Sequence, residues 1–508
     1  MDILSAHATA HPDKPALVCG DDVLTYAALE ERACRAANVF LDLGLRAGDR
    51  VATISFNSIA SFEVSSGLRK LGAVGVPVNF RLRGEELAYV LNDSGAAAVC
   101  AGPESVPHVE AVRPLLTKNP ALLSLADAPA PAGWLRMDER MRAASPLAPA
   151  SPNEVGTGAT MIYTSGTTGH PKGAYRPQGL PLEQVLHTIE LFTLRADDVH
   201  LMAGPGYHSA VGFFASLTLA CGATVVIMPR FEPELALQLI ERHRVTTTFM
   251  APILLQRIVD LPPEVQGRYG LSSMRVIVVA AAPCPFWLKQ RVQERFGEVL
   301  WEFYGATETG INTVLRPEEQ LRKPGSVGRA APGHEILLLD DEGRPVPDGQ
   351  PGEVWVKNAW LATYYNRPDA TARAMRDGYL SVGDVAYRDA DGYYYICDRK
   401  VDMIISGGVN IYPAEVESCL GGHPAVADVA VIGVPDDRWG EAVKALVVLR
   451  PGAAATEEEL IDWCRRRIAD YKRPRSVDFV DALPRDQAGK LLKRQIRERY
   501  WADAGRWI

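Results

Sequence analysis

Short apolar runs alternate with amphipathic segments along most of this chain, and no other feature restricts its fold as much. RVATISF (50–56) and MRVIVVAAA (274–282) are short apolar runs, typical of buried strands. PELALQLIERHR (233–244) and PFWLKQRVQERFG (285–297) have the pattern of amphipathic helices. Because alternating strands and helices build parallel sheets with helices on both faces, we predict doubly wound α/β layers.

The pattern changes from about residue 333. HEILLLDDEGRPVPDG and YRDADGYYYICDR place turn signals between alternating runs, which predicts hairpins. A small α+β unit then follows, with a helix predicted over 456–468. The chain has 508 residues, 47% of them hydrophobic, and this exceeds the size that one core usually supports. We therefore expect two or more domains.

Charge and cysteine usage exclude several classes of protein. The net charge is −8, from 54 basic and 62 acidic residues, so the overall field does not attract nucleic acid. The eight cysteines are scattered without a CxxC pair, as expected of reduced thiols. The N-terminal stretch does not have the pattern of a signal peptide, and no apolar run is long enough for a membrane span. We predict a cytoplasmic protein without integral membrane association.

The stretch YTSGTTGHPKGA (163–174) has the composition of a phosphate-binding loop. It contains three glycines, four Ser or Thr hydroxyls and one lysine. Glycine lets backbone amides approach an anion closely, the hydroxyls add donors, and Lys172 supplies a charge. It is not a Walker loop, because Pro171 precedes the lysine. On composition alone, a flexible surface loop remains the alternative.

Further blocks follow in a fixed order along the chain. They are LTYAALEERACRAANVFLDLGLRAGDRVA (24–52), PVNFRLRGEEL (77–87), GPGYHSAVG (204–212), EFYGATETG (302–310), GYLSVGD (378–384), DRKVDMIISGGVNIYPAEVE (398–417) and PRDQAGKLLKR (484–494). With the loop, this ordered set resembles the signature of the adenylate-forming superfamily, which includes acyl-CoA synthetases, peptide-synthetase adenylation domains and firefly luciferase. The resemblance covers nearly the whole chain and is closest to fatty-acid-type acyl-CoA ligases.

The resemblance implies an architecture and a reaction. The large domain, with a β-barrel-like subdomain, would cover 1–398, a hinge 399–402 and a small mobile α+β domain 403–508. A carboxylic acid and ATP would give an acyl adenylate and pyrophosphate, and the thiol of CoA would then give acyl-CoA and AMP. Negative charge gathers at the α-phosphate in the first step, so Mg²⁺ and a positioned cation are expected there.

The resemblance also assigns roles in the ATP site. The loop and Lys172 would hold the β- and γ-phosphates, Tyr304 would flank the adenine, and Thr307 would bind the α-phosphate. Glu308, with Thr164, would hold Mg²⁺. The implied nucleotide-binding set is Thr164, Ser165, Gly166, Thr167, Thr168, Gly169, Lys172, Glu302, Tyr304, Thr307, Asp384, Arg399 and Lys490. Of these, Asp384 and Arg399 would grip the ribose, and Lys490 would bridge the acyl carboxylate and the α-phosphate. The residues expected to act in catalysis are Lys490, Lys172, Thr307, Glu308 and His208.

The acyl pocket is predicted from small and apolar residues. His208 would lie near the acyl carboxylate as a gating residue, and a core histidine without a chemical role is the alternative. Acetate-type enzymes of the family carry tryptophan where this chain has Gly305, so an open channel is expected here. The predicted lining is His208, Phe213, Ala280, Ala281 and Gly305. A medium- or long-chain fatty acid or a bulky apolar acid should fit. An aryl acid of the benzoate or coumarate type is the alternative.

The CoA site and the hinge are assigned to the C-terminal part. Gly407 and Gly408 would line the pantetheine tunnel, and Lys472 and Arg473 in RRRIADYKRPR (465–475) would meet the CoA phosphates. Val401 stands at the hinge position, where the family commonly has Lys or Asp, and Val409 replaces the glutamate of GGEN.

Two further functions remain open for the same motifs. One is an acyl-AMP ligase that loads a carrier-protein thiol, and the other is a non-catalytic adenylate-binding sensor. The expected partners are the acid, ATP and CoA, with no nucleic acid. A homodimer is one candidate for the oligomeric state.

Overall fold

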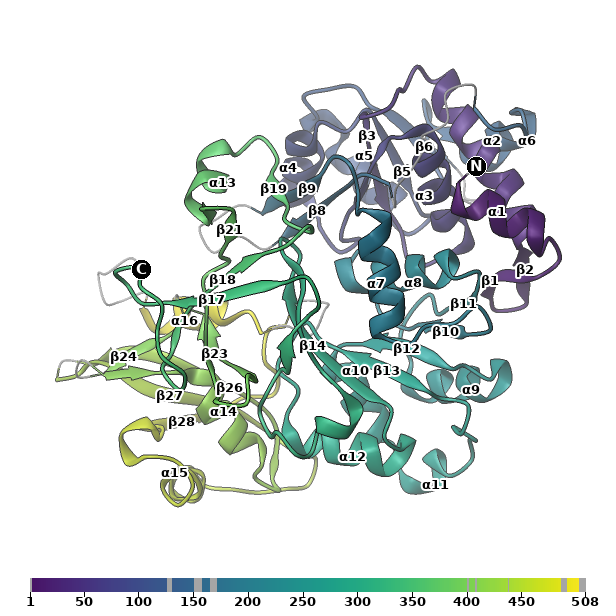
Figure 1. Cartoon of the computed structure of the whole chain (residues 1–508). Helices are drawn as coiled ribbons and strands as arrows, with labels where there is room; N and C mark the ends of the chain where they lie inside the picture. The colour runs from purple at the N-terminus through teal and green to yellow at the C-terminus, as the bar shows by residue number, and fades with distance from the viewer. Residues whose placement is uncertain are drawn as a thin grey trace.

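The computed structural model describes residues 2–125, 130–149, 158–164, 171–399, 402–406, 409–436, 438–485 and 491–501. These residues form four sheets with helices packed around them (Figure 1). The helices are α1 Ile3–Ala10, α2 Tyr26–Asp42, α3 Ile59–Leu71, α4 Gly84–Ser94, α5 Val106–Val112, α6 Met137–Ala143, α7 Leu182–Leu191, α8 Ser209–Ala220, α9 Pro233–His243, α10 Pro252–Val259, α11 Pro263–Gln266, α12 Phe286–Phe296, α13 Pro368–Ala374, α14 Pro413–Gly421, α15 Glu457–Arg465 and α16 Lys493–Trp501.

The first two sheets are the predicted doubly wound layers. The nine-stranded sheet has the order β16 Arg329–Ala330, β15 Gly310–Leu315, β14 Leu300–Ala306, β13 Val276–Val279, β12 Thr247–Met250, β10 Val199–Met202, β11 Thr224–Ile227, β1 Pro15–Cys19 and β2 Asp22–Thr25. The eight-stranded sheet has the order β19 Thr363–Tyr364, β9 Lys172–Arg176, β8 Thr160–Thr164, β4 Val74–Pro77, β3 Arg50–Ile54, β5 Ala98–Ala101, β6 Ala121–Ser124 and β7 Leu135–Arg136. Their central strands pair in parallel, and antiparallel pairs are confined to the ends of each sheet, so the predicted fold class is confirmed.

The other two sheets are mainly antiparallel. A six-stranded sheet, in the region predicted to hold hairpins, contains β17 Glu335–Leu339, β18 Gly352–Lys357, β20 Met375–Arg376, β21 Tyr379–Leu380, β22 Asp384–Arg388 and β23 Tyr394–Arg399. A five-stranded sheet contains β24 Ile404–Ser406, β25 Val409–Ile411, β26 Val426–Asp436, β27 Gly440–Leu449 and β28 Ser476–Phe479. The five-stranded sheet contacts a helix of the N-terminal part, because Gln256 on α10 donates to the carbonyl of Ala427 in β26 at 3.2 Å. The domain boundary at 399–402 stays a prediction.

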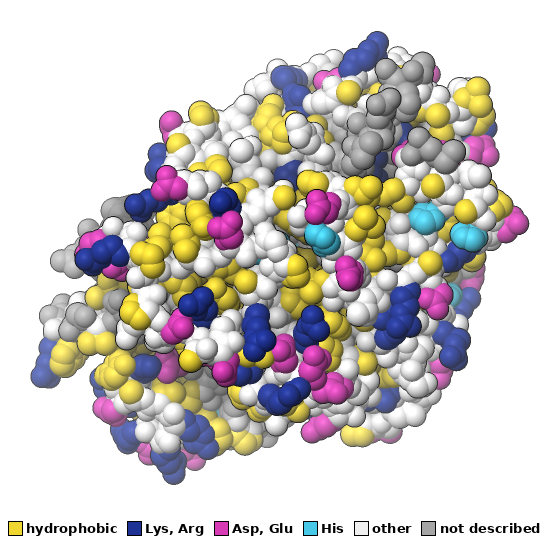
Figure 2. All heavy atoms as spheres, viewed as in Figure 1, with side chains coloured by type: hydrophobic (Ala, Val, Ile, Leu, Met, Phe, Trp, Pro, Cys, Tyr) yellow, Lys and Arg dark blue, Asp and Glu magenta, His cyan; other side chains and the backbone are white. Residues whose placement is uncertain are grey.

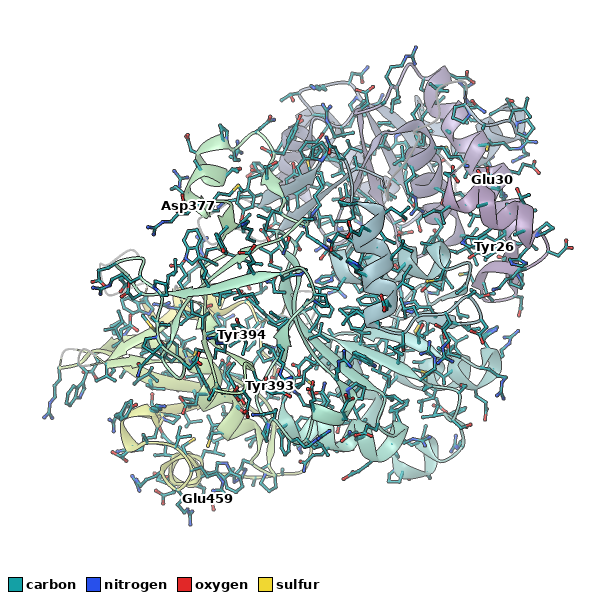
Figure 3. All side chains as sticks on the ribbon, viewed as in Figure 1. Tyr26, Glu30, Asp377, Tyr393, Tyr394 and Glu459 are labelled. Carbon is teal, nitrogen blue, oxygen red and sulfur yellow. The ribbon has the colours of Figure 1, made fainter. Side chains whose placement is uncertain are left out.

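Close packing of α2 on α3 explains one glycine of the N-terminal block. A Cβ on Gly67 would lie 2.6 Å from the Cβ of Ala36, so only glycine lets the two helices approach this closely. Helix α2 also carries Tyr26 and Glu30, which are labelled in Figure 3. Tyr26 donates to the Ala223 carbonyl at 2.7 Å, and Glu30 accepts from Lys70 of α3 at 2.7 Å. The first contact attaches α2 to the segment before β11 of the first sheet, and the second joins α2 to α3.

The predicted elements lie close to their expected limits. The strand predicted at 50–56 is β3, the helix at 233–244 is α9, and the helix at 285–297 is α12. The helix expected over 456–468 is α15, and it ends at Arg465, three residues early. All eight cysteines are free thiols, as predicted.

The surface matches the modest net charge of the sequence. On the face shown in Figure 2, basic and acidic side chains are interspersed among apolar ones. In the described part of the chain, no helix has the length and hydropathy needed to cross a membrane.

Candidate functional site

The phosphate-loop strand and the EFYGATETG block meet at the carboxylate of Glu308. Thr164, at the end of β8, donates to its Oε1 atom at 3.0 Å. The hydroxyl of Tyr364 donates to the same oxygen at 3.1 Å. The residue is only 7% exposed, so these donors fix its orientation with little competition from water. Residues 144 positions apart in the sequence, Thr164 and Glu308, are therefore joined as the resemblance implies.

Tyr364 also connects this carboxylate with Lys172. The ammonium nitrogen of Lys172 lies 5.0 Å from the centroid of the Tyr364 ring, within cation–π range. The tyrosine is placed there by β19, which pairs with β9 so that Tyr364 lies opposite Ala174. Sequence reasoning missed Tyr364, because TYYNRPDA contains no pattern that marks a tyrosine as functional.

Thr307 connects the nucleotide motif with the GPGYHSAVG block. Its Oγ1 lies 3.1 Å from Oγ of Ser209, the first residue of α8. His208 directly precedes this helix as its N-cap residue. The expected α-phosphate ligand therefore lies beside the entrance to the expected acyl pocket.

The residues expected to hold the nucleoside are also brought together. The hydroxyl of Tyr304 donates to Oδ2 of Asp384 at 2.7 Å, and Asp384 is 8% exposed. Asp384 begins β22 and lies opposite Arg399 of β23. The pairing of these strands thus brings the two expected ribose ligands side by side, although the side chain of Arg399 lies outside the described part.

Several predicted site residues cannot be located in the described residues. These are Ser165, Gly166, Thr167, Thr168, Gly169, Val401, Gly407, Gly408 and Lys490. Their roles stay predictions from the sequence.

A small apolar hollow, with a volume of about 10 Å³, lies next to this site. Its lining residues are Gly204, Pro205, His208, Val211, Phe249, Ala251, Leu254 and Ala281. Two of the predicted acyl-pocket residues, His208 and Ala281, are among them. Ala281 has a φ of 75°, which is unusual for a residue with a side chain. Phe213 instead packs edge-on against Trp360 at 5.1 Å, and Ala280 is buried in the core at 3% exposure.

The backbone around Gly305 gives a second reason for glycine at this position, besides an open acyl channel. A Cβ at this position would lie 1.9 Å from the carbonyl oxygen of Gly310, on the neighbouring strand. The β14–β15 register shifts between Tyr304 and Gly305, which brings the two backbones close together. Backbone packing therefore also favours glycine at this position, and the place of Gly305 in the acyl channel stays a prediction.

Glu302 also has a different environment from the one predicted. It is 4% exposed and forms a buried ion pair with Lys289 of α12. Burial raises the pKa of Glu302, and the neighbouring ammonium opposes this shift. The carboxylate is thus directed into the core of the first sheet, where it pairs with Lys289, and a nucleotide contact by this residue stays a prediction.

The residues predicted to meet CoA have partners of their own in the small sheet region. Lys472 forms an ion pair with Glu415 at 2.7 Å, and Arg473 forms one with Asp470 at 2.7 Å. Both pairs are partly exposed, and surface pairs typically contribute only about 0–1 kcal/mol. The contact of these two residues with CoA stays a prediction.

The donor set at Glu308 is compatible with Mg²⁺. This ion prefers oxygen ligands and usually binds through one or two carboxylates together with substrate phosphates. Thr164 and Glu308 supply a hydroxyl and a carboxylate beside the phosphate-loop strand. Among the described residues no cluster of three or more His, Cys, Asp or Glu side chains could hold a metal by itself, so the phosphates of ATP would complete the site.

Comparisons with known proteins agree with this geometry. The AMP-binding enzyme family matches residues 4–366, and the C-terminal domain of AMP-binding enzymes matches residues 415–490. A feruloyl-CoA synthase from Amycolatopsis sp is 40% identical over 500 residues, which are 98% of this chain and 97% of that protein. A long-chain-fatty-acid–CoA ligase from Mycobacterium tuberculosis is 36% identical over 508 residues, with 98% of each chain covered.

A solved structure extends the similarity to the fold. ATP-bound MatB from Rhodopseudomonas palustris is 30% identical, covers 99% of both chains and superposes with a TM-score of 0.88. Sequence blocks, site geometry and relatives all lead to one assignment: this chain belongs to the AMP-binding enzyme family and is an AMP-forming acid–thiol ligase.

Proposed function

We propose that the protein is an ATP- and Mg²⁺-dependent acyl-CoA synthetase for a bulky apolar carboxylic acid. The observation that carries this proposal is the position of Glu308, which is held by Thr164 and Tyr364 at one end of a site that continues into an apolar hollow. A carboxylate is a poor electrophile, and adenylation replaces its oxide by AMP, a much better leaving group.

In the first half-reaction a carboxylate oxygen attacks the α-phosphorus of ATP and pyrophosphate leaves. Lys172 and the loop would hold the departing phosphates, while Thr307 would donate to the α-phosphate. Mg²⁺, held by Glu308 and Thr164, would neutralise phosphate charge when bound. Lys490 would bring a further positive charge to the acyl carboxylate and the α-phosphate.

In the second half-reaction the CoA thiol attacks the acyl carbon and AMP leaves. His208 lines the hollow, and the acyl carboxylate would lie near it. We assign it gating and positioning of the acid. A rotation about Val401 would bring Gly407 and Gly408 to the adenylate, and Lys472 and Arg473 would exchange their carboxylate partners for CoA phosphates.

The hollow is the basis for the substrate class. Apart from His208 its lining is apolar, so a charged or strongly polar acyl group would lose hydration without gaining partners.

An aryl acid is a specific second candidate. Phe249 forms part of the hollow and stacks on Phe214 with ring centroids 5.5 Å apart, which offers a flat aromatic wall. The feruloyl-CoA synthase relative makes this candidate worth equal testing with fatty acids.

The test is a panel of fatty, alicyclic and aryl acids with ATP and CoA, read by mass spectrometry of the acyl-CoA products. Acid-dependent exchange between ATP and pyrophosphate is measured in parallel. Products from apolar acids support the proposal. Exchange without any CoA product indicates a ligase for a carrier-protein thiol, and absence of exchange for every acid contradicts the proposed reaction.

A further inference from the structure

Arg176 links two segments that meet only in the folded protein. It is the last residue of β9, the strand that begins at Lys172. Its Nε donates to the carbonyl oxygen of Trp360 at 2.5 Å, and its Nη2 donates to the carbonyl oxygen of Thr307 at 2.5 Å. The guanidinium of Arg176 thus joins β9 to the turn that carries Thr307 and to the segment before β19.

The same turn is held from the same segment by other contacts. The Ala362 amide donates to the Glu308 carbonyl at 2.8 Å, and Nδ2 of Asn358 donates to the Thr309 carbonyl at 2.9 Å. Asn358 also accepts from the Trp360 amide at 2.6 Å. The segment 358–362 therefore supports the turn, and Arg176 ties this support to β9.

Arg176 brings a positive charge close to Glu308, the carboxylate expected to hold Mg²⁺. Burial lowers the pKa of Arg176 to about 10, and the negative charge of Glu308 opposes the shift. Even at that pKa the guanidinium stays protonated at neutral pH, and its Nε and Nη2 atoms donate to backbone carbonyls. A partly buried cation with such partners is costly to maintain, so a purely hydrophobic residue would serve better if packing were its only role.

We propose that Arg176 is a positioning residue for Mg·ATP, which fixes the backbone of Thr307 and Glu308 relative to the phosphate-binding strand. It touches neither the reacting atoms nor the ion, and it acts through the geometry of the turn. This inference rests on the proposed roles of Thr307 and Glu308. Residues that orient metal ligands from behind typically change metal affinity or activity by about 10- to 100-fold when they are replaced.

The test uses Arg176→Gln, which removes the charge and the forked donor, and Arg176→Lys, which keeps the charge alone. Binding of Mg·ATP is measured by calorimetry without acid, and exchange between ATP and pyrophosphate is measured across a range of Mg²⁺ concentrations. Thioester formation from supplied acyl-AMP is measured separately. Arg295→Gln is the matched control, since Nη2 of Arg295 also donates to two backbone carbonyls, those of Gln266 and Tyr269, away from the site.

We expect Arg176→Gln to raise the Mg²⁺ concentration for half-maximal exchange and to weaken Mg·ATP binding, each by about 10- to 100-fold. Arg176→Lys should fall between this variant and the parent, and thioester formation from acyl-AMP should stay near the parent rate. If both Arg176 variants lose only thermal stability, as Arg295→Gln is expected to, with unchanged Mg·ATP binding, the residue is structural and the proposal is wrong.

Glu308→Gln separates this proposal from the one on which it rests. If Glu308→Gln weakens Mg·ATP binding and Arg176→Gln does not, the positioning role alone fails. If Glu308→Gln has no effect on the Mg²⁺ requirement, the metal-binding role of Glu308 fails, and the proposal for Arg176 fails with it.

Discussion

Replacing Tyr364 with phenylalanine tests the contact between the phosphate-loop hairpin and the carboxylate expected to hold Mg²⁺. The change removes one hydroxyl, which donates to Oε1 of Glu308 at 3.1 Å. The ring remains, so the packing 5.0 Å from the Lys172 ammonium is preserved. The substitution therefore isolates the hydrogen bond from the cation–π contact.

The expected magnitude follows from the burial of the carboxylate. Glu308 is 7% exposed, so water cannot easily replace the lost donor. A hydrogen bond to a charged group contributes about 1.5–3 kcal/mol, which corresponds to roughly 10- to 150-fold in an equilibrium or a rate. Because Thr164 still donates to the same oxygen at 3.0 Å, we expect the lower end, about 10-fold in kcat/KM for Mg·ATP.

The assay is acid-dependent exchange between ATP and pyrophosphate, with Mg·ATP varied at saturating acid. Tyr365→Phe is the matched control, since the neighbouring ring packs edge-on against Tyr175 with centroids 5.4 Å apart. The control should behave as the parent. If Tyr364→Phe keeps parental kinetics while Glu308→Gln does not, Tyr364 does not position the carboxylate and the reasoning is refuted.

Three further predictions follow from other parts of the structure. Gly305→Ala should lower thermal stability, because overpacking typically costs about 1–3 kcal/mol. It should also reduce kcat/KM for all acids alike. An active variant with a changed acid preference would instead support a place for Gly305 in the pocket wall. His200 is buried with its pKa lowered from 6.5 to about 4, so the fold should lose about 3 kcal/mol as pH falls from above 6.5 to about 4. Urea unfolding of His200→Gln should lack this part of the pH dependence, and an unchanged dependence would assign it to other groups. Lys490→Ala should reduce adenylation by about 10²–10³ while sparing thioester formation from supplied acyl-AMP, and an equal loss in both half-reactions would remove its assigned role.

The sequence determined the fold class and the family, because both depend on local information. The length and periodicity of a single segment predict strands such as β3 and β13 and helices such as α9 and α12. The motif blocks likewise carry their residue types within a few positions, so Thr164, Thr307, Glu308, Tyr304 and Asp384 could be selected before their contacts were known.

The tertiary structure decided which residues surround those motifs and which glycines are available to a substrate. Tyr364 contacts Glu308 and Arg176 contacts the Thr307 carbonyl because distant segments pair as strands, and nothing in their local sequence indicates these contacts. Gly305 could not be distinguished from a pocket glycine, since the 1.9 Å approach to Gly310 arises only from the shifted β14–β15 register. Glu302 lies two residues before Tyr304, yet the strand directs it into the core, where Lys289 from a separate helix meets it. Local sequence specifies chemical groups and backbone preference, whereas the distance between groups far apart in the chain is set by how sheets and helices pack.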